Sequence, residues 1–485
     1  MINYRLLFRI IGQLLFIEAG FLLICLAVSL WYGEDDSFSF LASTLLTTFG
    51  GLIARFVGRD SDNNLSRRDA YLVVTAAWVV FSIFGMFPFL IGGFIPNVTN
   101  AYFETMSGFT TTGASILDDV EHLPHGILFW RTMTQWIGGL GIVFFTIAVL
   151  PSIVGGSMKV FAAEATGPIK SKLHPRLSTS AKWIWSIYLV LTVACAVSFW
   201  AAGMGLFDSI NYSMTTTATG GFAPHNDSLL HFHSPLIEYL GILFQFLSGI
   251  NFMMLYMSVF KGKILDLCRN SEFRLYIAVV TVATVWIMSL LITTRNYELE
   301  QAFRSALFQV VSFITTPGLF NDDAGQWPHI TWVVLGCSMF IGGCAGSTSG
   351  GFKCIRGVMI LKVIRNEFRR ILHPNAVLPV KINGQTVPQS TLPSLLSFLS
   401  VFVLMSVVSA TIMISVGVDN TNAITIALSC VSNVGPTLGT EIGPVMSWNI
   451  LPDVVKWITS VLMLMGRLEI MTVLLLFTPA FWKDN

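Results

Sequence analysis

A short motif of threonine and glycine recurs four times, at wide spacing, in a chain made largely of long apolar runs. The copies are Thr110–Gly113, Thr217–Gly220, Thr315–Gly318 and a degenerate Ser432–Gly435. Their glycines lie 107, 98 and 117 residues apart, and each copy follows a short half-apolar stretch and precedes a long apolar one. The repetition predicts four equivalent loops at membrane depth. Such loops can close a ring of backbone carbonyls around a dehydrated cation, so the pattern indicates an ion pathway.

Composition places this chain in the membrane. Of its 485 residues, 54% are hydrophobic and only 11% are charged, whereas a soluble domain carries roughly 25% charged residues. The deficit predicts that most of the surface faces lipid. A net charge of +1 gives no indication of a nucleic-acid partner.

The apolar runs predict ten membrane spans, since a span needs about 20 residues. Two leading spans are expected at 6–32 and 38–57, followed by four units of span, short segment and span. The first spans are expected at 71–95, 182–204, 273–294 and 393–417. The second spans are expected at 126–151, 235–260, 329–364 and 453–481. The short segments, near 100–110, 207–217, 302–314 and 420–432, cross only about half of the hydrocarbon core. They are predicted to be half-helices that enter, stop at the motif and return as extended chain.

The predicted fold is therefore an all-α polytopic membrane protein: four parallel span–pore-half-helix–span repeats around a central pore, plus two N-terminal spans. The N-terminal helices are expected in 1–69 and the first two repeats in 70–160 and 161–262. The third repeat, 263–385, is expected to have a broken second span with an intramembrane loop, and the fourth repeat is 386–485.

Charge placement predicts the orientation. We find 23 of the 28 lysine and arginine residues in the termini and in the connectors on one side of the predicted membrane. The opposite loops hold acidic residues, including Asp118, Asp119 and Glu121. The positive-inside rule then puts the basic connectors in the cytoplasm and the threonine–glycine loops toward the outside. Each repeat contains two full spans, so all four enter with the same polarity.

The four loops are the predicted selectivity filter. Backbone carbonyls bind a monovalent cation without a full negative charge, glycine permits the required backbone angles, and a half-helix aims its negative C-terminal end at the ion. Small residues for helix packing are the alternative for any single copy, and the fourfold recurrence favours the filter. The predicted potassium-binding residues are Thr111, Thr112, Gly113, Ala218, Thr219, Gly220, Thr316, Pro317, Gly318, Asn433, Val434 and Gly435.

A glycine- and serine-rich segment in the middle of the third repeat's second span is the predicted gate. Irregular backbone at membrane depth persists only where it lines water or is buried in protein. A packed kink is the alternative, and the spacing does not fit a phosphate-binding loop. Arg467, deep in the last span, is expected to set a barrier or to hold this loop shut, unless it forms a structural pair with Glu469 or reaches toward the interface. The predicted gate residues are Gly342, Gly343, Gly346, Ser347, Thr348, Gly350, Gly351 and Arg467.

The histidines and cysteines do not predict an enzyme. Seven cysteines contain no CxxC pair, so neither a zinc site nor a disulfide framework is indicated. His231 and His233 are two residues apart and resemble a metal motif, but no cysteine or carboxylate lies at a set spacing from them. A surface loop is therefore the interpretation of that pair, and the only metal expected is potassium at the filter.

These motifs resemble the Trk/Ktr/HKT superfamily of potassium transporters. The TTTGAS, TATGGF and TTPGLF loops, the GGCAGSTSGGFK segment, and HPNAV, MGRLE and LFTPAFW look most like its bacterial TrkH branch. The resemblance covers nearly the whole chain. It implies a filter ring from four loops, an intramembrane loop from the third repeat and a nearby arginine. It also implies a homodimer in the bacterial cytoplasmic (inner) membrane, bound to a cytosolic nucleotide-binding regulatory ring of the TrkA type, with no cofactor in this chain.

The resulting expectation is inward potassium transport through a gated, channel-like pore. In plant relatives a serine in the first loop accompanies sodium transport, so Gly113 favours potassium by resemblance. A proton- or sodium-coupled symporter is the first alternative, with Glu104 and Glu469 as its candidate acidic residues. The potassium-binding subunit of an ATP-driven pump is the second alternative. A membrane enzyme is the most distant alternative, because no nucleophile–base or metal set is present.

Overall fold

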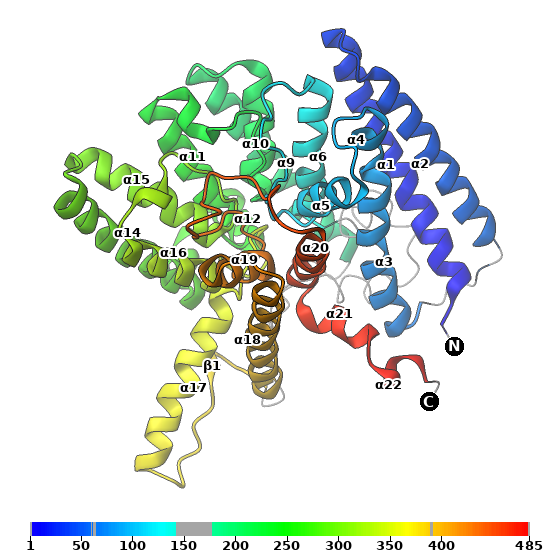
Figure 1. Cartoon of the computed structure of the whole chain (residues 1–485). Helices are drawn as coiled ribbons and strands as arrows, with labels where there is room; N and C mark the ends of the chain where they lie inside the picture. The colour runs from blue at the N-terminus through cyan, green and yellow to red at the C-terminus, as the bar shows by residue number, and fades with distance from the viewer. Residues whose placement is uncertain (1, 60, 62–64, 142–176, 389–390, 484–485) are drawn as a thin grey trace.

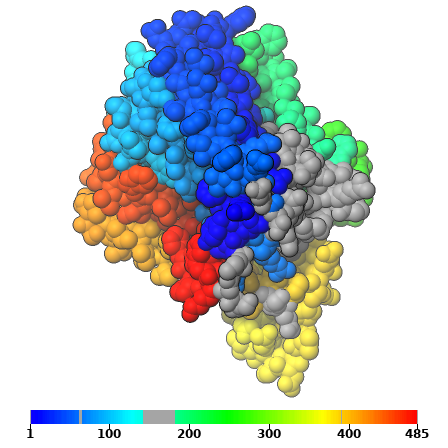
Figure 2. Space-filling view, turned by 90° about the vertical axis from the view of Figure 1, so that its right-hand side faces the viewer, coloured from blue at the N-terminus to red at the C-terminus, as the bar shows by residue number. Residues whose placement is uncertain are grey.

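The computed structural model describes residues 2–59, 61, 65–141, 177–388 and 391–483, and within these residues the chain is almost entirely helical. Two leading helices, α1 (Tyr4–Tyr32) and α2 (Ser37–Val57), form an antiparallel hairpin along one side of the molecule (Figure 1). Figure 2 shows this hairpin in blue, with the C-terminal residues in red close to the N-terminal end.

Four units follow in chain order, each with a spanning helix, a short helix and a second helical segment. The first has α3 (Arg67–Gly85), α4 (Phe87–Ile91), α5 (Val98–Phe109) and α6 (His125–Gly139). The second has α9 (Leu177–Ala201), α10 (Leu206–Ala218), η1 (Ser228–Phe232), α11 (Pro235–Ser248), α12 (Phe252–Lys261) and α13 (Ile264–Arg269).

The third unit has α14 (Ser271–Arg295), α15 (Leu299–Thr315), η2 (Ala324–Gln326), α16 (His329–Ile341) and α17 (Cys354–Leu372). The fourth has α18 (Thr391–Ser415), α19 (Asn420–Ser432), α20 (Asp453–Arg467), α21 (Ile470–Leu476) and α22 (Pro479–Trp482). At the end of the third unit, α17 projects from the body of the molecule (Figure 1). A small hairpin of β1 (Lys381–Ile382) and β2 (Gln385–Thr386) follows it, before α18. The all-α expectation did not include this hairpin, whose two-residue strands are joined by Asn383 and Gly384, both at positive φ.

The predicted half-helices are confirmed as α5, α10, α15 and α19. With 17 residues, α15 is longer than expected. Its first turns are held by Arg304, which pairs with Glu300 on the same helix at 2.9 Å and with Glu238 on α11 at 2.6 Å. These ion pairs stabilise a polar first turn of α15, which the prediction from apolar residues did not include.

The second spans differ from the prediction, because they are interrupted. We expected continuous helices over 235–260 and 453–481, but α11 and α12 meet at 105° and α20 and α21 at 116°. The predicted break in 329–364 is confirmed as the non-helical stretch between α16 and α17. The expected span 126–151 is helical as far as Gly139, and the residues beyond Gly141 lie outside the described part of the chain, as do Lys159, Lys170, Lys172 and Arg176 of the predicted basic connector.

Six helical segments among the described residues are long and apolar enough to cross a membrane, and eight are if each bent pair counts as one span. The six comprise both leading helices and the first helical segment of every unit. The chain is therefore a multi-pass membrane protein.

Glycines allow the half-helices to pack against the breaks in the second spans. A Cβ atom on Gly139 would lie 2.9 Å from the Ala218 Cα atom of α10, and one on Gly249 would lie 2.5 Å from the Thr315 Cγ2 atom of α15. A Cβ atom on Gly350 would overlap the carbonyl oxygen of Ser432 at the end of α19. In each case a glycine of one unit contacts the half-helix of the next. This close approach explains why the breaks fall where they do, since any side chain there would separate the units.

The two ends of the molecule carry opposite charge patterns. We call the end with the chain returning from each half-helix the loop face (residues 114–124, 222–234, 319–328 and 436–452), and the opposite end the connector face. At the connector face, Arg68 Nη1 donates to the Lys483 carbonyl at 2.7 Å, which brings basic segments from both ends of the chain together. At the loop face, Glu34 accepts from the His125 backbone N–H at 2.6 Å and from its Nδ1 atom at 2.7 Å.

The glycine contacts predict a stability difference between two helical positions. An added methyl group at Gly138 would overlap the Phe109 carbonyl oxygen at the end of α5, so Gly138→Ala should lower the free energy of unfolding by about 1–3 kcal/mol. The matched control is Gly336→Ala in α16, where the nearest atom to an added Cβ is Leu428 Cδ2 at 3.9 Å. Thermal melting of the detergent-purified variants measures the difference. Equal melting temperatures would contradict the proposed close packing.

Candidate functional site

Each half-helix ends in the same unusual backbone conformation. The residues Thr111, Thr219, Thr316 and Asn433 have φ values between 53° and 67°, in the left-handed region that non-glycine residues rarely occupy. Two residues later comes a glycine with φ between 70° and 97°: Gly113, Gly221, Gly318 and Gly435. The residue between them has negative φ. All four loops therefore share one backbone pattern.

A backbone hydrogen bond closes three of the four half-helices in the same way. The N–H groups of Thr112, Gly220 and Val434 each donate to the carbonyl five residues earlier, at distances of 2.9, 2.9 and 3.0 Å. This is the six-to-one bond that commonly ends a helix. In the third loop the equivalent residue is Pro317, which has no N–H to donate. Ser312, the residue that would accept this bond, instead donates its side-chain hydroxyl to the Leu319 carbonyl at 2.5 Å.

The four loops touch one another in a closed cycle. A Cβ atom on Gly113 would overlap the Gly220 carbonyl oxygen, and one on Gly221 would overlap that of Pro317. A Cβ atom on Gly318 would overlap the Val434 carbonyl oxygen, and one on Gly435 would overlap that of Thr112. Each glycine therefore lies against a carbonyl of the next loop, and the fourth loop returns to the first. We call these loops the filter ring (residues 111–113, 219–221, 316–318 and 433–435).

The filter ring corrects the alignment of the second loop. The sequence spacing matched Gly220 with Gly113, but the backbone conformation, the closing hydrogen bond and the cyclic contacts all match Gly221 with Gly113. Gly220 instead corresponds to Thr112, and Ala218 is the last residue of α10. Two adjacent glycines, Gly220 and Gly221, allowed both alignments, and the sequence offered no measure of φ to choose between them.

Above the filter ring lies a cavity of about 130 Å³ that opens toward the loop face. We call it the vestibule. All four ring glycines with positive φ line it, together with residues of all four return segments, the third of which contributes Phe320. Arg131 of α6 also lines the vestibule, and its side chain is almost completely buried.

Arg131 organises the vestibule wall, a role that sequence reasoning missed. Its Nε atom pairs with Glu104 of α5 at 3.0 Å, and its terminal nitrogens donate to the Ala223 carbonyl at 3.2 Å and to Ser115 Oγ at 3.1 Å. Glu104 also accepts from the Ile116 N–H at 3.0 Å. One ion pair thus fixes the return segments of two repeats. A charged residue inside a predicted span was the available signal, since such charges require a partner or a cavity.

Side-chain hydrogen bonds brace the ring from behind. Thr215 Oγ1 donates to Gln135 Oε1 at 2.7 Å, and the same oxygen accepts from the Phe222 N–H at 3.0 Å. Asn433 Nδ2 donates to Thr112 Oγ1 at 3.0 Å and to the Met463 carbonyl at 2.8 Å. Asn433 replaces the threonine of the other loops and here links the fourth loop to the first.

The glycine- and serine-rich segment 342–353, the intramembrane loop, lies against the ends of the half-helices. Thr348 Oγ1 donates to the Thr217 carbonyl at 3.0 Å, and the Gly351 N–H donates to the Ser432 carbonyl at 2.9 Å. The Gly350 N–H donates to Thr316 Oγ1 at 2.7 Å. The C-terminal carbonyls of a helix have no partner within it, so this loop caps α10 and α19 and touches the third filter loop. The backbone turns at Gly342, Gly346 and Gly351 have positive φ.

Arg467 joins the intramembrane loop to the first repeat. Its Nη1 atom donates to the Thr348 carbonyl at 2.9 Å, and its Nη2 atom donates to the Gly138 carbonyl at 2.6 Å and also to that of Gly139. Glu469 forms an ion pair with Arg356 of α17. Of the predicted gate residues, Gly346, Thr348, Gly350, Gly351 and Arg467 thus contact other repeats, whereas Ser347 bonds within the loop.

Two further charged residues, which sequence reasoning missed, anchor the intramembrane loop. Glu272, at the start of α14, accepts from the Ala345 N–H at 2.6 Å and from the Ile355 N–H at 3.1 Å. Lys353 is buried and donates to the Ser349 carbonyl within the loop. The loop is therefore held at both ends as well as against the half-helices.

Comparison with known proteins gives full-length matches. The family model described as TrkH, cation transport protein, matches residues 37–484. The Trk system potassium uptake protein TrkH of Escherichia coli (strain K12) is 38% identical, with 99% of this chain and 100% of that protein covered. The related TrkG of the same strain is 33% identical, with 99% of each chain covered. The crystal structure of the potassium transporter TrkH from Vibrio parahaemolyticus has 35% sequence identity and a TM-score of 0.89, and the match covers 99% of this chain and 100% of that one.

The corrected alignment predicts unequal effects at the adjacent glycines. Gly221→Ala places a side chain at φ 94°, against a backbone carbonyl. The left-handed backbone alone costs roughly 1–2 kcal/mol, so the variant should melt well below wild type. Gly220 has negative φ, and in Gly220→Ala the added methyl group meets the Gln135 side chain rather than backbone, so the loss should be smaller. Thermal melting compares the two, and a larger loss in Gly220→Ala would support the alignment given by sequence spacing.

Proposed function

The chain belongs to the TrkH family of cation transport proteins, and on this basis we propose that it carries potassium inward across the bacterial cytoplasmic membrane through a gated, channel-like pore. The family consists of transporters rather than enzymes. Its relatives are Trk system potassium uptake proteins. The observation that carries the proposal is the closed filter ring beneath the vestibule.

Selection of the ion is assigned to the filter ring. A cation that enters from the vestibule loses water and needs oxygens in its place, which backbone carbonyls supply. The half-helices end at the ring, and the negative ends of their dipoles favour a cation there. The buried Thr111, Thr219 and Thr316 side chains belong to this assignment. The potassium-binding residues predicted from the sequence therefore stand as a proposal, with Gly221 added to the second loop.

Gating is assigned to the intramembrane loop and Arg467. The loop occupies carbonyls at the ends of two half-helices, and the arginine ties it to the C-terminal end of α6. A guanidinium group there also repels a passing cation. Opening would require these hydrogen bonds to break together, so the closed state has a defined set of contacts.

Orientation and partners follow the same reasoning. The basic connector face fits the cytoplasm by the positive-inside rule. On this face α17 projects from the body and carries the exposed apolar residues Phe368, Ile371 and Leu372 (Figure 1). The relatives are named as parts of a Trk system, and we propose α17 as a docking element for a cytosolic nucleotide-binding ring. A homodimer also belongs to this proposal.

The coupled symporter receives less support. Its candidate acidic residues are both engaged in ion pairs, Glu104 with Arg131 and Glu469 with Arg356. A third acidic residue within a span, Glu18, is buried in α1 beside Gly85, one layer outside α5. Glu18 was not among the predicted site residues, and its position does not place it on the filter ring.

Rubidium uptake into proteoliposomes tests the proposed function. The purified chain should take up radioactive rubidium, and external potassium should compete strongly while sodium competes weakly. Uptake should be passive and proportional to the electrochemical gradient, because no coupling site is assigned. Equal competition by sodium would overturn the potassium filter. Saturable uptake that requires a proton or sodium gradient would favour the symporter instead.

Substitution of Arg467 tests the gate. A unit charge about 6 Å from a passing cation costs roughly 3 kcal/mol at an effective dielectric constant of about 20, and each 1.4 kcal/mol is about tenfold in rate. Arg467→Ala should therefore raise basal rubidium flux by about tenfold or more, and Arg467→Lys should raise it less. Arg295→Ala, on the exposed end of α14, is the matched charge-removal control. Unchanged flux through folded Arg467→Ala protein would assign the arginine a purely structural role.

A further inference from the structure

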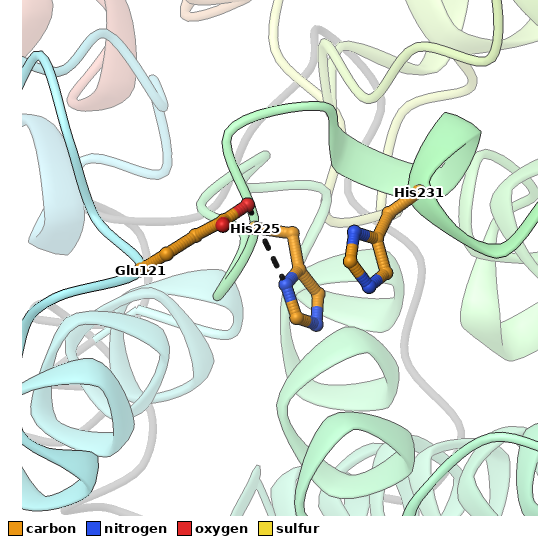
Figure 3. Close-up of side chains that lie close together, drawn as sticks. All are labelled: Glu121, His225 and His231. Atoms are coloured by element: carbon orange, nitrogen blue, oxygen red, sulfur yellow. Dashed lines mark ion pairs between the residues drawn. The ribbon is translucent and has the colours of Figure 1, made fainter.

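Two histidines and a glutamate meet at the loop face, beside the vestibule. Glu121 belongs to the return segment of the first repeat, His225 to that of the second, and His231 to η1. Figure 3 shows the two imidazole rings side by side, with the Glu121 carboxylate directed at His225. The sequence singled out His231 and His233 as a metal-like pair, but the histidine beside His231 is His225, and the carboxylate comes from another repeat.

The geometry of this cluster is compact. The His225 and His231 rings lie 3.7 Å apart and nearly parallel, and His225 Nδ1 lies 3.8 Å from Glu121 Oε1. On its other edge, His225 Nε2 lies 3.4 Å from Asp208 Oδ1 of α10. One ligand atom from each of Glu121, His225 and His231 can be chosen so that all lie within 4.8 Å of one another.

The central histidine has unused bonding capacity. Both ring nitrogens of His225 are shielded from solvent, and neither forms a hydrogen bond with any described residue. Buried polar atoms are normally satisfied, so each such atom requires an explanation. The carboxylates of Glu121 and Asp208 lie on either side of the ring but beyond hydrogen-bond geometry. Neither nitrogen of His225 is therefore used as a hydrogen-bond donor or acceptor by the described residues.

We propose that Glu121, His225 and His231 bind a divalent transition-metal ion, with zinc as the best match. Imidazole nitrogens and a carboxylate oxygen are zinc ligands, and three of them leave a fourth position for water. Ligand atoms around tetrahedral zinc lie about 3.3 Å apart, so the separations, all within 4.8 Å, must close by at most about 1.5 Å. Glu121 and His231 are exposed, and rotation of their side chains supplies this movement without a change in the backbone.

Asp208 acts as a positioning residue in this site. When Nδ1 of His225 faces Glu121 and the metal, Nε2 carries the proton and faces Asp208. A metal-bound histidine typically donates its other N–H to such a carboxylate, which fixes the tautomer and the ring orientation. Asp208 therefore completes a carboxylate–histidine–metal arrangement with residues from two repeats.

Metal binding would restrain the entrance to the pathway. Asn226 and the first return segment are already joined by hydrogen bonds, from the Val120 N–H to Asn226 Oδ1 at 3.0 Å and from the Asn226 N–H to Glu121 Oε1 at 3.3 Å. His225 and Asn226 also line the vestibule. A bound zinc ion would cross-link these segments and place two positive charges at the wall. External zinc should therefore inhibit cation flux, a consequence that rests on the proposed function.

Protonation of His225 is the competing interpretation. Asp208 and Glu121 flank its ring, His231 stacks on it, and the side chains of Asp119, His122 and Asp227 lie on the neighbouring segments. A proton would also satisfy the two carboxylates. It would, however, place positive charge against His231, whereas a metal ion uses both rings as ligands.

Calorimetric titration of zinc into the full-length protein in detergent tests the site without reference to flux. Wild type should bind one zinc ion, and His225→Ala and His231→Ala should each weaken binding at least about tenfold. Asp208→Asn should weaken it by about 10–100-fold. His233→Ala, an exposed histidine two residues from His231, should bind as wild type does. Absence of zinc binding, or binding undiminished in both His225→Ala and His231→Ala, would overturn the proposal.

A flux measurement then separates this inference from the proposed function. Zinc outside the proteoliposomes should slow rubidium uptake in wild type and His233→Ala but not in His231→Ala. If wild-type protein binds zinc but shows no uptake at all, the site stands and the proposed function fails. If uptake proceeds and falls only on acidification, with no zinc bound, the cluster is a proton site and the metal proposal is wrong.

Discussion

Close contact between glycines and atoms of the neighbouring repeat is the constraint on which the rest of this structure depends. It occurs in two layers. In one layer, glycines at the breaks of the second spans allow the half-helices to reach the centre of the molecule. In the other layer, the four ring glycines lie against carbonyls of the next loop and close the cycle. A side chain at any of these positions would separate the repeats, so the fourfold arrangement rests on the absence of Cβ atoms.

Polar side chains then hold in place the half-helices and loops that the glycines allow to pack closely. The negative ends of four half-helices converge on one small region. Hydrogen-bond donors lie on both sides of this region, one set toward the loop face and one toward the connector face. Toward the loop face, Arg131 satisfies Glu104 and both adjacent return segments. Toward the connector face, the intramembrane loop and Arg467 occupy carbonyls at the ends of the half-helices and at the C-terminal end of α6. The loop is thus in direct contact with the ring of the four loops, through the hydrogen bond from the Gly350 N–H to Thr316 Oγ1.

Much of this architecture was predictable from sequence, for identifiable reasons. The half-helices were found because their length is about half of a span and each ends at a threonine–glycine motif. The bends at 249–251 and 468–469 were missed because the apolar runs on both sides of each bend together have the length of one span, although Asn251, Arg467 and Glu469 stand at the bends. The second loop was aligned one residue early because Gly220 and Gly221 differ in φ and not in chemistry. Arg131–Glu104 and Glu121–His225 join residues far apart in sequence, so no local pattern could have paired them.

The interlocked ring also bears on how such a protein can change over generations. In an assembly of four identical subunits, one mutation alters every loop at once. Here a single gene encodes four loops that differ already, with Pro317 in one and Asn433 in another. Side chains that brace the ring can therefore diverge one loop at a time, whereas each ring glycine is tied to its neighbour's backbone. We therefore expect evolution to change the side chains that hydrogen-bond to the ring and to conserve the ring glycines. Ion preference can then change gradually while the ring remains closed.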